Sequence, residues 1–177
     1  MKIIIIGALP SSLMNFRGKL IEAFTFNGNE VIAMASDATS VEIERIGDFG
    51  AKYIDYPVKS NEINPLVDLK TLAYFVKVFK SEKPDAVLAY TVKPIIFGGI
   101  ASRFFKLDFY ALITGLGFAF QGDSFKRKLL TKLVVFLYKI ALKRSKSIIF
   151  QNKDNLDLFV DKGIVLRSKT HVVNGSG

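Results

Sequence analysis

The stretch Lys2-Ile3-Ile4-Ile5-Ile6-Gly7 decides the fold of this 177-residue chain. Four consecutive isoleucines leave neither side of an extended strand polar, and a glycine ends the run. Strands that are apolar on both sides are typical of parallel sheets covered by helices on both faces. The sequence therefore predicts an α/β domain with this run as a buried strand.

Further elements alternate along the chain outward from this run. Short apolar runs predict strands at 31–35, 52–56, 86–90, 109–113, 147–150 and 170–173. Helical spacing and capping residues predict helices at 15–26, 40–49, 65–83, 94–105, 124–144 and 153–161. A polar turn is expected at 10–12, before the first helix. The alternation predicts a doubly wound, mainly parallel, Rossmann-like sheet, on which ligands bind beyond the carboxyl ends of the strands.

Composition excludes several classes of protein. The length favours one domain, and a chain that is 50% hydrophobic and 23% charged is not disordered. The absence of cysteine excludes a disulfide scaffold, and a single histidine, His171, argues against a histidine-based metal site or triad. The longest charge-free runs have 14 residues, short of the ~18 apolar residues that suggest a membrane-spanning helix.

The net charge of +9 comes from one segment. Residues 124–153 carry nine basic and no acidic residues, whereas the rest of the chain carries 16 of each sign. Within the helix expected at 124–144, the lysines 128, 132, 139 and 143 form a narrow stripe. A broad apolar face lies beside them: Leu129, Leu130, Leu133, Val134, Phe136, Leu137, Ile140 and Ala141.

Three more apolar residues, Val135, Tyr138 and Leu142, are expected on the far side of this helix. Apolar residues nearly all round, with a lysine stripe, are typical of a helix at an anionic membrane surface. The membrane-binding residues predicted on this basis are Lys126, Arg127, Lys128, Lys132, Lys139, Lys143 and Arg144. The alternative is a core helix with a solvated lysine stripe. Nucleic acid is disfavoured because few aromatic or arginine residues interleave with the lysines.

Polar and glycine-rich loops follow several predicted strands. The loop after the first strand contains Gly7, Ala8, Asn15 and Arg17, and can hold an anion at the start of the next helix. It lacks the G-x-G-x-x-G pattern, so a dinucleotide enzyme, with Asp37 on the ribose, is the weaker alternative. An ordinary strand-to-helix turn also remains open.

Two later loops carry further candidates. Thr91 and Lys93 follow the fourth strand on a stretch expected to be extended, so both can face one crevice, although Lys93 could equally be solvated. The loop at 114–123 has three glycines and two phenylalanines, and long loops of this kind inside compact domains are usually functional.

Together these motifs resemble a known family. The order and spacing are similar to the N-terminal half of family 4 glycosyltransferases, in particular bacterial enzymes that build capsule, O-antigen or glycoprotein glycans on polyprenyl diphosphate. The motifs are Ser12-Leu-Met-Asn-Phe-Arg-Gly18, Tyr90-Thr-Val-Lys-Pro94 with Gly98-Gly99, Ile113-Thr-Gly-Leu-Gly-Phe-Ala-Phe120, Phe150-Gln-Asn152 and Val173-Asn-Gly-Ser-Gly177.

The resemblance implies the GT-B architecture, in which two Rossmann-like domains enclose the active site. The N-terminal domain binds the acceptor, here a lipid-diphosphate-linked sugar, and the C-terminal domain binds a nucleotide sugar, taken as UDP-linked. Transfer is retaining, with no metal and no further cofactor. The substrate-binding residues that it implies are Gly7, Ala8, Asn15, Arg17, Thr91, Lys93, Thr114, Gly115, Gly117 and Asn152. The histidine common in the family after the fifth strand has no counterpart in Thr114–Gly117, so its role is not carried over.

The resemblance also implies which domain of the enzyme this chain represents. Residues 1–174 match the acceptor-binding domain, 175–177 the start of the interdomain linker, and no donor domain follows. The chain alone is therefore expected to be inactive, and peripheral on the cytoplasmic face of the plasma membrane. Either a donor domain in cis has been lost, or a partner chain supplies it to a non-catalytic membrane-docking subunit.

Overall fold

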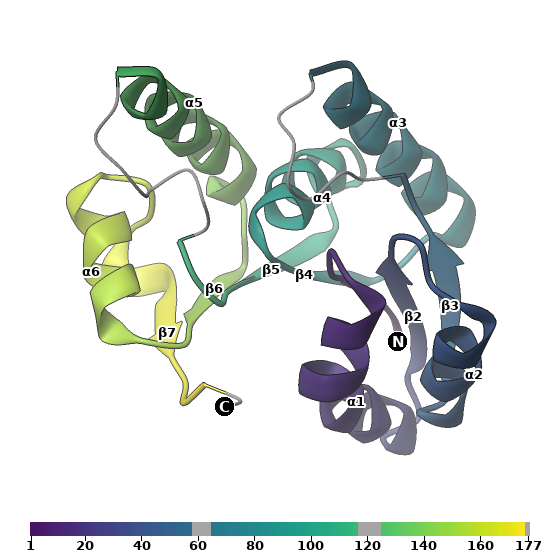
Figure 1. Ribbon diagram of the computed structural model, residues 1–177. Helices are drawn as coiled ribbons and strands as arrows, with labels where there is room; N and C mark the ends of the chain where they lie inside the picture. The colour runs from purple at the N-terminus through teal and green to yellow at the C-terminus, as the bar shows by residue number, and fades with distance from the viewer. Residues whose placement is uncertain (58–64, 117–124, 176–177) are drawn as a thin grey trace.

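The computed structural model describes residues 1–57, 65–116 and 125–175. Seven parallel strands form one sheet in the order β3-β2-β1-β4-β5-β6-β7 (Figure 1). The strands are β1 (Lys2–Ile6), β2 (Glu30–Ala35), β3 (Ala51–Asp55), β4 (Ala86–Tyr90), β5 (Asp108–Ile113), β6 (Ser147–Phe150) and β7 (Thr170–Val172). The order reverses between β1 and β4, which is the topological switch point of a doubly wound sheet.

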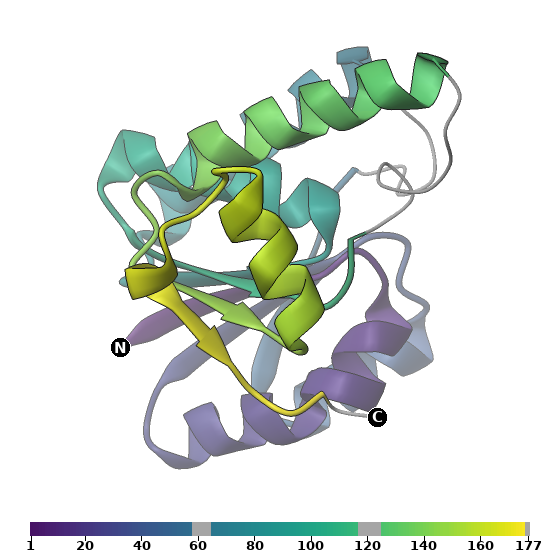
Figure 2. The same ribbon diagram turned by 90° about the vertical axis from the view of Figure 1, so that its left-hand side faces the viewer.

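Helices cover both faces of this sheet, as Figures 1 and 2 show. Their core side chains place α1 and α2 on one face and α3, α4, α5 and α6 on the other. The helices are α1 (Pro10–Phe26), α2 (Ser40–Asp48), α3 (Pro65–Glu82), α4 (Val92–Phe105), α5 (Phe125–Leu142) and α6 (Lys153–Asp161). The predicted doubly wound, Rossmann-like sheet is thereby confirmed.

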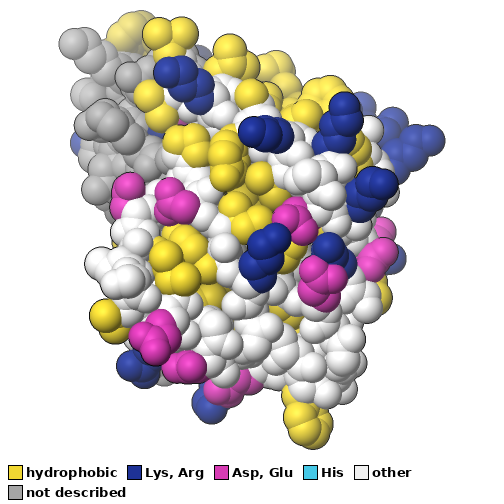
Figure 3. Space-filling view, turned by 90° about the vertical axis from the view of Figure 1, so that its right-hand side faces the viewer, with side chains coloured by type: hydrophobic (Ala, Val, Ile, Leu, Met, Phe, Trp, Pro, Cys, Tyr) yellow, Lys and Arg dark blue, Asp and Glu magenta, His cyan; other side chains and the backbone are white. Residues whose placement is uncertain are grey.

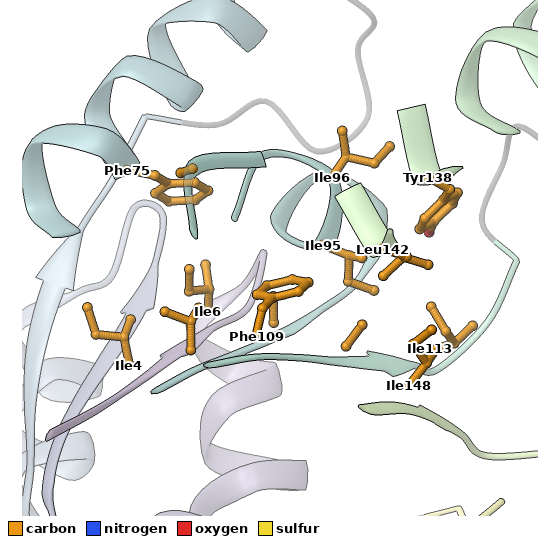
Figure 4. Close-up of a cluster of buried hydrophobic side chains, with 14 of the residues drawn as sticks. Ile4, Ile6, Phe75, Ile95, Ile96, Phe109, Ile113, Tyr138, Leu142 and Ile148 are labelled. Carbon is orange, nitrogen blue, oxygen red and sulfur yellow. The ribbon is translucent and has the colours of Figure 1, made fainter. Parts of the chain in front are cut away.

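The isoleucines of β1 pack into the hydrophobic core on both faces of the sheet. Ile4 and Ile6 belong to the cluster under α3, α4 and α5, and Ile3 and Ile5 to the cluster under α1 and α2. All four are at most 8% exposed, and burial of such a side chain contributes about 1.5–3 kcal/mol. Figure 4 shows Ile4 and Ile6 beneath Phe75, with Ile95 and Phe109 alongside.

Two helices begin earlier than the sequence predicts. The turn expected at 10–12 is wrong, because α1 already begins at Pro10, in the first-turn position where the fixed backbone angle of proline suits a helix. Helix α4 begins at Val92, so the stretch with Thr91 and Lys93 is not extended as expected. These two helix starts stand at the switch point, and their positions shape the site described below.

Gly7 allows β1 and β4 to end in close contact. A Cβ atom at this position would lie 2.2 Å from the Tyr90 hydroxyl oxygen and 2.4 Å from Cζ of the same ring. The Gly7 carbonyl accepts a 2.6 Å hydrogen bond from the Tyr56 hydroxyl, and its N–H donates to the Met34 carbonyl. The glycine is therefore held from three sides where no side chain fits.

Gly7→Ala is expected to lower the free energy of unfolding by about 2 kcal/mol or more, because the new methyl group overlaps the Tyr90 ring. Urea unfolding followed by circular dichroism measures the change. Gly47→Ala in α2 is the control, since a Cβ there meets nothing within 4 Å. It should instead stabilise by about 0.5–1 kcal/mol through helix propensity. Equal effects of the two substitutions would contradict the close-contact argument.

Candidate functional site

A pocket of about 190 Å³ opens at the carboxyl end of the sheet, beside the switch point. Helix α1 supplies one wall, and the ends of β4, β5 and β6 supply the other. The lining residues are Ser12, Phe16, Arg17, Tyr90, Thr91, Thr114 and Gln151. The pocket lies where doubly wound sheets bind their ligands, so we take it as the candidate active site.

Arg17 brings a positive charge into the wall of this pocket. Its side chain is only 6% exposed. The guanidinium donates a 2.7 Å hydrogen bond from Nη1 to the Phe16 carbonyl and lies 4.9 Å from the centre of the Tyr90 ring. Burial lowers the pKa of Arg17, and an anion in the pocket would favour the charged form. A planar guanidinium in this position suits a phosphate or carboxylate group.

Thr91 has a strained backbone. Its φ of 67° and ψ of 159° fall in a region that is essentially restricted to glycine, and a β-branched side chain makes the conformation more costly. Its Oγ1 atom is buried and has no hydrogen-bond partner among the described residues. Strain combined with an unsatisfied buried hydroxyl is common where a residue contacts a ligand, so Thr91 is a strong candidate for substrate contact.

Tyr90 links these two residues to the glycine loop. The phenol is 1% exposed, with its ring against Arg17 and its hydroxyl over Gly7. Burial raises the pKa of Tyr90 to about 12, although Ser12 and Arg17 oppose the shift. The group is therefore a neutral phenol at physiological pH. It supports Arg17 by a cation–π contact and keeps its hydroxyl proton at neutral pH.

The structure brings three predicted site residues together and places others elsewhere. Arg17, Thr91 and Thr114 line the pocket, from three different elements. Gly115 follows Thr114 in open space, where a Cβ would meet nothing within 4 Å. Asn15 is exposed on α1 and does not line the pocket. Gly117, with Phe118 and Phe120, lies outside the described residues.

The remaining predicted site residues have structural partners. The Lys93 ammonium pairs with the Asp68 carboxylate of α3 at 2.7 Å, with both side chains largely buried. The Asn152 side chain caps α6 by accepting a 2.8 Å hydrogen bond from the Asn155 N–H. Ala8 is buried, and its carbonyl accepts from the Ser36 hydroxyl. Neither Gly7 nor Ala8 lines the pocket, and the substrate roles of all these residues stay predictions.

Sequence analysis missed four lining residues: Ser12, Phe16, Tyr90 and Gln151. Ser12 was assigned to a turn, whereas the early start of α1 places it in the pocket wall. Tyr90 ends a wholly buried strand, and its pattern indicates core packing alone. Gln151 could have been preferred over Asn152, because an asparagine just before a helix is a typical N-cap residue.

Helix α5 has an exposed face that differs from the expected one. Tyr138 and Leu142, expected on the far side, are in the core beside Val134 and Ala141. The centre of the predicted apolar face is instead open to solvent, with Leu129 62%, Leu133 49% and Phe136 59% exposed. The reason is that Tyr138 and Leu142 fit the space over β5 and β6, beside Phe159 of α6.

The lysines of α5 share this outer face. Lys128, Lys132 and Lys139 are exposed on the helix, and Lys143 and Arg144 are exposed just after its end. Arg127 is half-buried, and the side chain of Lys126 lies outside the described residues. The outer face of α5, defined by Phe125, Leu129, Leu133, Phe136 and these exposed lysines, thus combines apolar and cationic side chains without an acidic residue.

The start of α3 adds to this exposed apolar surface. Leu66 and Leu69 are both more than 60% exposed, and α3 and α5 lie on the same side of the sheet in Figures 1 and 2. Figure 3, which views the molecule from the side of α3, shows apolar side chains gathered toward the top of that face. Within residues 1–57, 65–116 and 125–175, no helix is long and apolar enough to cross a bilayer.

The chain is similar to several known proteins. The chain matches the family described as glycosyl transferase 4-like over residues 6–152. A curated relative is the N,N'-diacetylbacillosaminyl-diphospho-undecaprenol alpha-1,3-N-acetylgalactosaminyltransferase of Campylobacter jejuni, 28% identical over 165 residues. The match covers 93% of this chain and 43% of the relative, so the chain spans less than half the relative's length.

Solved structures share the fold at lower identity. Anabaena HepE, crystallised with UDP and glucose, is 14% identical with a TM-score of 0.67, over 99% of this chain and 44% of that one. The UDP-GlcNAc 2-epimerase of Methanocaldococcus jannaschii is 17% identical with a TM-score of 0.61, over 99% and 46%. Because a transferase-family chain and an epimerase share this fold, the fold alone does not define the reaction.

The strain at Thr91 predicts an unusual stability order. The free energy of unfolding of the Thr91→Gly variant should be about 1 kcal/mol higher than that of the Thr91→Ala variant, because glycine adopts the positive φ without steric cost. Urea titration of the two variants gives the difference. At an ordinary exposed helix position, such as Lys132, the order should reverse, with alanine the more stable. If the Thr91→Ala variant proved more stable than the Thr91→Gly variant, the backbone at Thr91 would not be strained.

Proposed function

Because the chain belongs to the glycosyl transferase 4-like family, we propose that it is the acceptor-binding half of a retaining glycosyltransferase. The donor is a nucleotide sugar, UDP-linked, and the acceptor is a sugar on a lipid diphosphate, in the synthesis of capsule, O-antigen or another surface glycan. The observation that carries this proposal is the match to a Campylobacter enzyme whose name gives an undecaprenol-diphosphate acceptor.

The pocket chemistry supports an anionic substrate. Arg17 offers a buried guanidinium, and Thr91 offers a buried hydroxyl that lacks a protein partner among the described residues. Both side chains suit the oxygens of a diphosphate. Thr114 and Gln151 add hydrogen-bonding groups suited to sugar hydroxyls on the other side of the pocket. Asp37, the residue that suggested a dinucleotide enzyme, is exposed after β2, and its backbone N–H donates a 2.8 Å hydrogen bond to the Asp55 carboxylate.

The outer face of α5 supports a membrane-bound acceptor. Exposed leucines and phenylalanines can enter the acyl boundary while the lysines meet anionic headgroups. This arrangement would hold the domain on the cytoplasmic surface of the plasma membrane, where it meets a lipid-linked sugar. The match leaves more than half of the Campylobacter relative's length uncovered, which is room enough for the donor-binding half of the proposed enzyme. That half would be supplied in cis or by a partner chain, with no metal or other cofactor.

We expect the chain to float with vesicles of phosphatidylcholine containing phosphatidylglycerol. Lys128→Glu with Lys132→Glu should reduce the bound fraction at least tenfold. Each lysine near anionic lipid contributes about 1 kcal/mol of attraction, and each substitution both removes that attraction and adds a repulsion of similar size. Flotation at physiological salt measures the bound fraction.

The matched control is Lys19→Glu with Lys162→Glu, which reverses two exposed lysines on α1 and after α6. This control should lower binding far less than the α5 pair. If both pairs of substitutions reduced vesicle binding equally, the binding would be a nonspecific attraction of a basic protein. The proposal that α5 contacts the membrane would then be wrong.

A second experiment tests the acceptor site separately. Adding a polyprenyl-diphosphate-linked N-acetylhexosamine to neutral vesicles should raise the bound fraction of the wild-type chain. Arg17→Lys should lose most of this increase and still bind phosphatidylglycerol vesicles, because the fork of the guanidinium is lost while the charge remains. An increase that survives in Arg17→Lys would argue against this pocket as the diphosphate site.

A further inference from the structure

A second pocket, of about 200 Å³, lies at the amino ends of the strands, whereas the candidate active site lies at their carboxyl ends. It is built where α4 ends, β5 begins and α5 ends. Three cationic side chains line it: Arg103 from α4, Lys106 from the connection to β5, and Arg144 from the segment after α5. The family resemblance assigns no function to this pocket.

The charge balance of this pocket favours an anion. Asp108 is the acidic residue in its lining, and the Asp108 carboxylate already pairs with the Lys146 ammonium. Arg103 donates one hydrogen bond, from Nη1 to the Ile140 carbonyl at 3.0 Å, which anchors the guanidinium at the end of α5. A guanidinium has five N–H donors, so this anchor occupies only part of its donor capacity.

The floor of the pocket is rigid. Gly99 brings α4 against α5, and a Cβ at Gly99 would lie 3.0 Å from both the Ala141 Cβ and the Ala141 carbonyl oxygen. Phe109 of β5 closes the third side at the same distance. Arg103 therefore projects from a tightly packed helix, and Lys106 and Arg144 follow directly after the two packed helices.

Lys106 occupies a backbone position that favours glycine. Its φ of 56° and ψ of 35° are left-handed, at the residue that ends α4. Glycine is the usual residue at such a helix end, because a side chain is strained there. A lysine in this position has less backbone stability than a glycine and adds a charge to the pocket rim.

We propose that this pocket binds a phosphate group through Arg103, Lys106 and Arg144. The ligand is either the phosphate of a membrane lipid headgroup or a free phosphate compound. The first source rests on the proposed membrane docking of α5, whose outer face ends beside the pocket at Lys143 and Arg144. The second source is independent of that docking.

The decisive variant is Lys106→Gly, which removes the charge and relieves the backbone strain, so its folding should not suffer. Lys83→Gly is its matched control, because Lys83 is also an exposed lysine with a positive φ, of 50°, and does not line the pocket. Inorganic phosphate and glycerol 3-phosphate are titrated into each protein, and NMR shifts of the backbone amides of Lys106, Leu107 and Arg144 report binding.

The wild-type chain and Lys83→Gly should bind phosphate equally. Lys106→Gly should bind about threefold more weakly, and Lys106→Gly with Arg144→Gln about tenfold more weakly. The absence of amide shifts in the wild type, or equal affinities of the two glycine variants, would overturn the proposal.

Flotation then separates the two sources. Vesicles containing phosphatidic acid are compared with vesicles of equal charge containing phosphatidylglycerol. If the ligand is a lipid phosphomonoester, Lys106→Gly should lose the preference for phosphatidic acid that the wild type shows. If the ligand is a free phosphate compound, Lys106→Gly should lose phosphate affinity with its flotation unchanged. A chain that binds no vesicles would contradict the proposed docking and leave the phosphate titration as the test of this pocket.

Discussion

The need to bury β1 on both faces organises this molecule. Ile4 and Ile6 require one apolar layer and Ile3 and Ile5 require another, so helices must cover both sides of the strand. Helix-containing connections then place β2 and β3 on one side of β1, and β4 to β7 on the other. The reversal of strand order next to β1 is a consequence of this arrangement, and it creates the crevice in which the candidate active site lies.

Close packing at that crevice joins the stability of the fold to the chemistry of the site. Gly7 lets the Tyr90 ring lie across the end of β1, and the ring in turn supports the Arg17 guanidinium. Thr91 follows in a backbone conformation that glycine would adopt more easily. The corner therefore combines a tightly packed residue, a buried cation and a strained hydroxyl around the Tyr90 ring, although they are far apart in the sequence. Strain of this kind persists because the surrounding packing stabilises it.

The two ends of the sheet carry different chemistry. The carboxyl ends of the strands present hydroxyl and amide groups beside a single buried arginine, which suits a sugar with an attached diphosphate. The amino end of β5 presents three cations over an apolar floor. Helix α5 runs between these ends, and its outer face combines exposed apolar side chains with lysines.

The sequence by itself determined the fold class, the order of the elements and the regions in which the site lies, because strand and helix periodicities are local properties of the chain. It also located Arg17, Thr91 and Thr114, since each lies in a loop or helix start beyond a predicted strand. The uneven charge of residues 124–153 is likewise visible without coordinates.

Only the tertiary structure decided which groups meet. The Lys93 ammonium pairs with the Asp68 carboxylate, and the Asn152 side chain caps α6. The Tyr90 ring lies against the Arg17 guanidinium. It also decided which side of α5 faces the core: Tyr138 and Leu142 are buried, whereas Leu129 and Phe136 are exposed. A helix that is apolar nearly all round does not specify its inner side. The shape of the space over β5 and β6 does, because that space comes from residues far away in the chain.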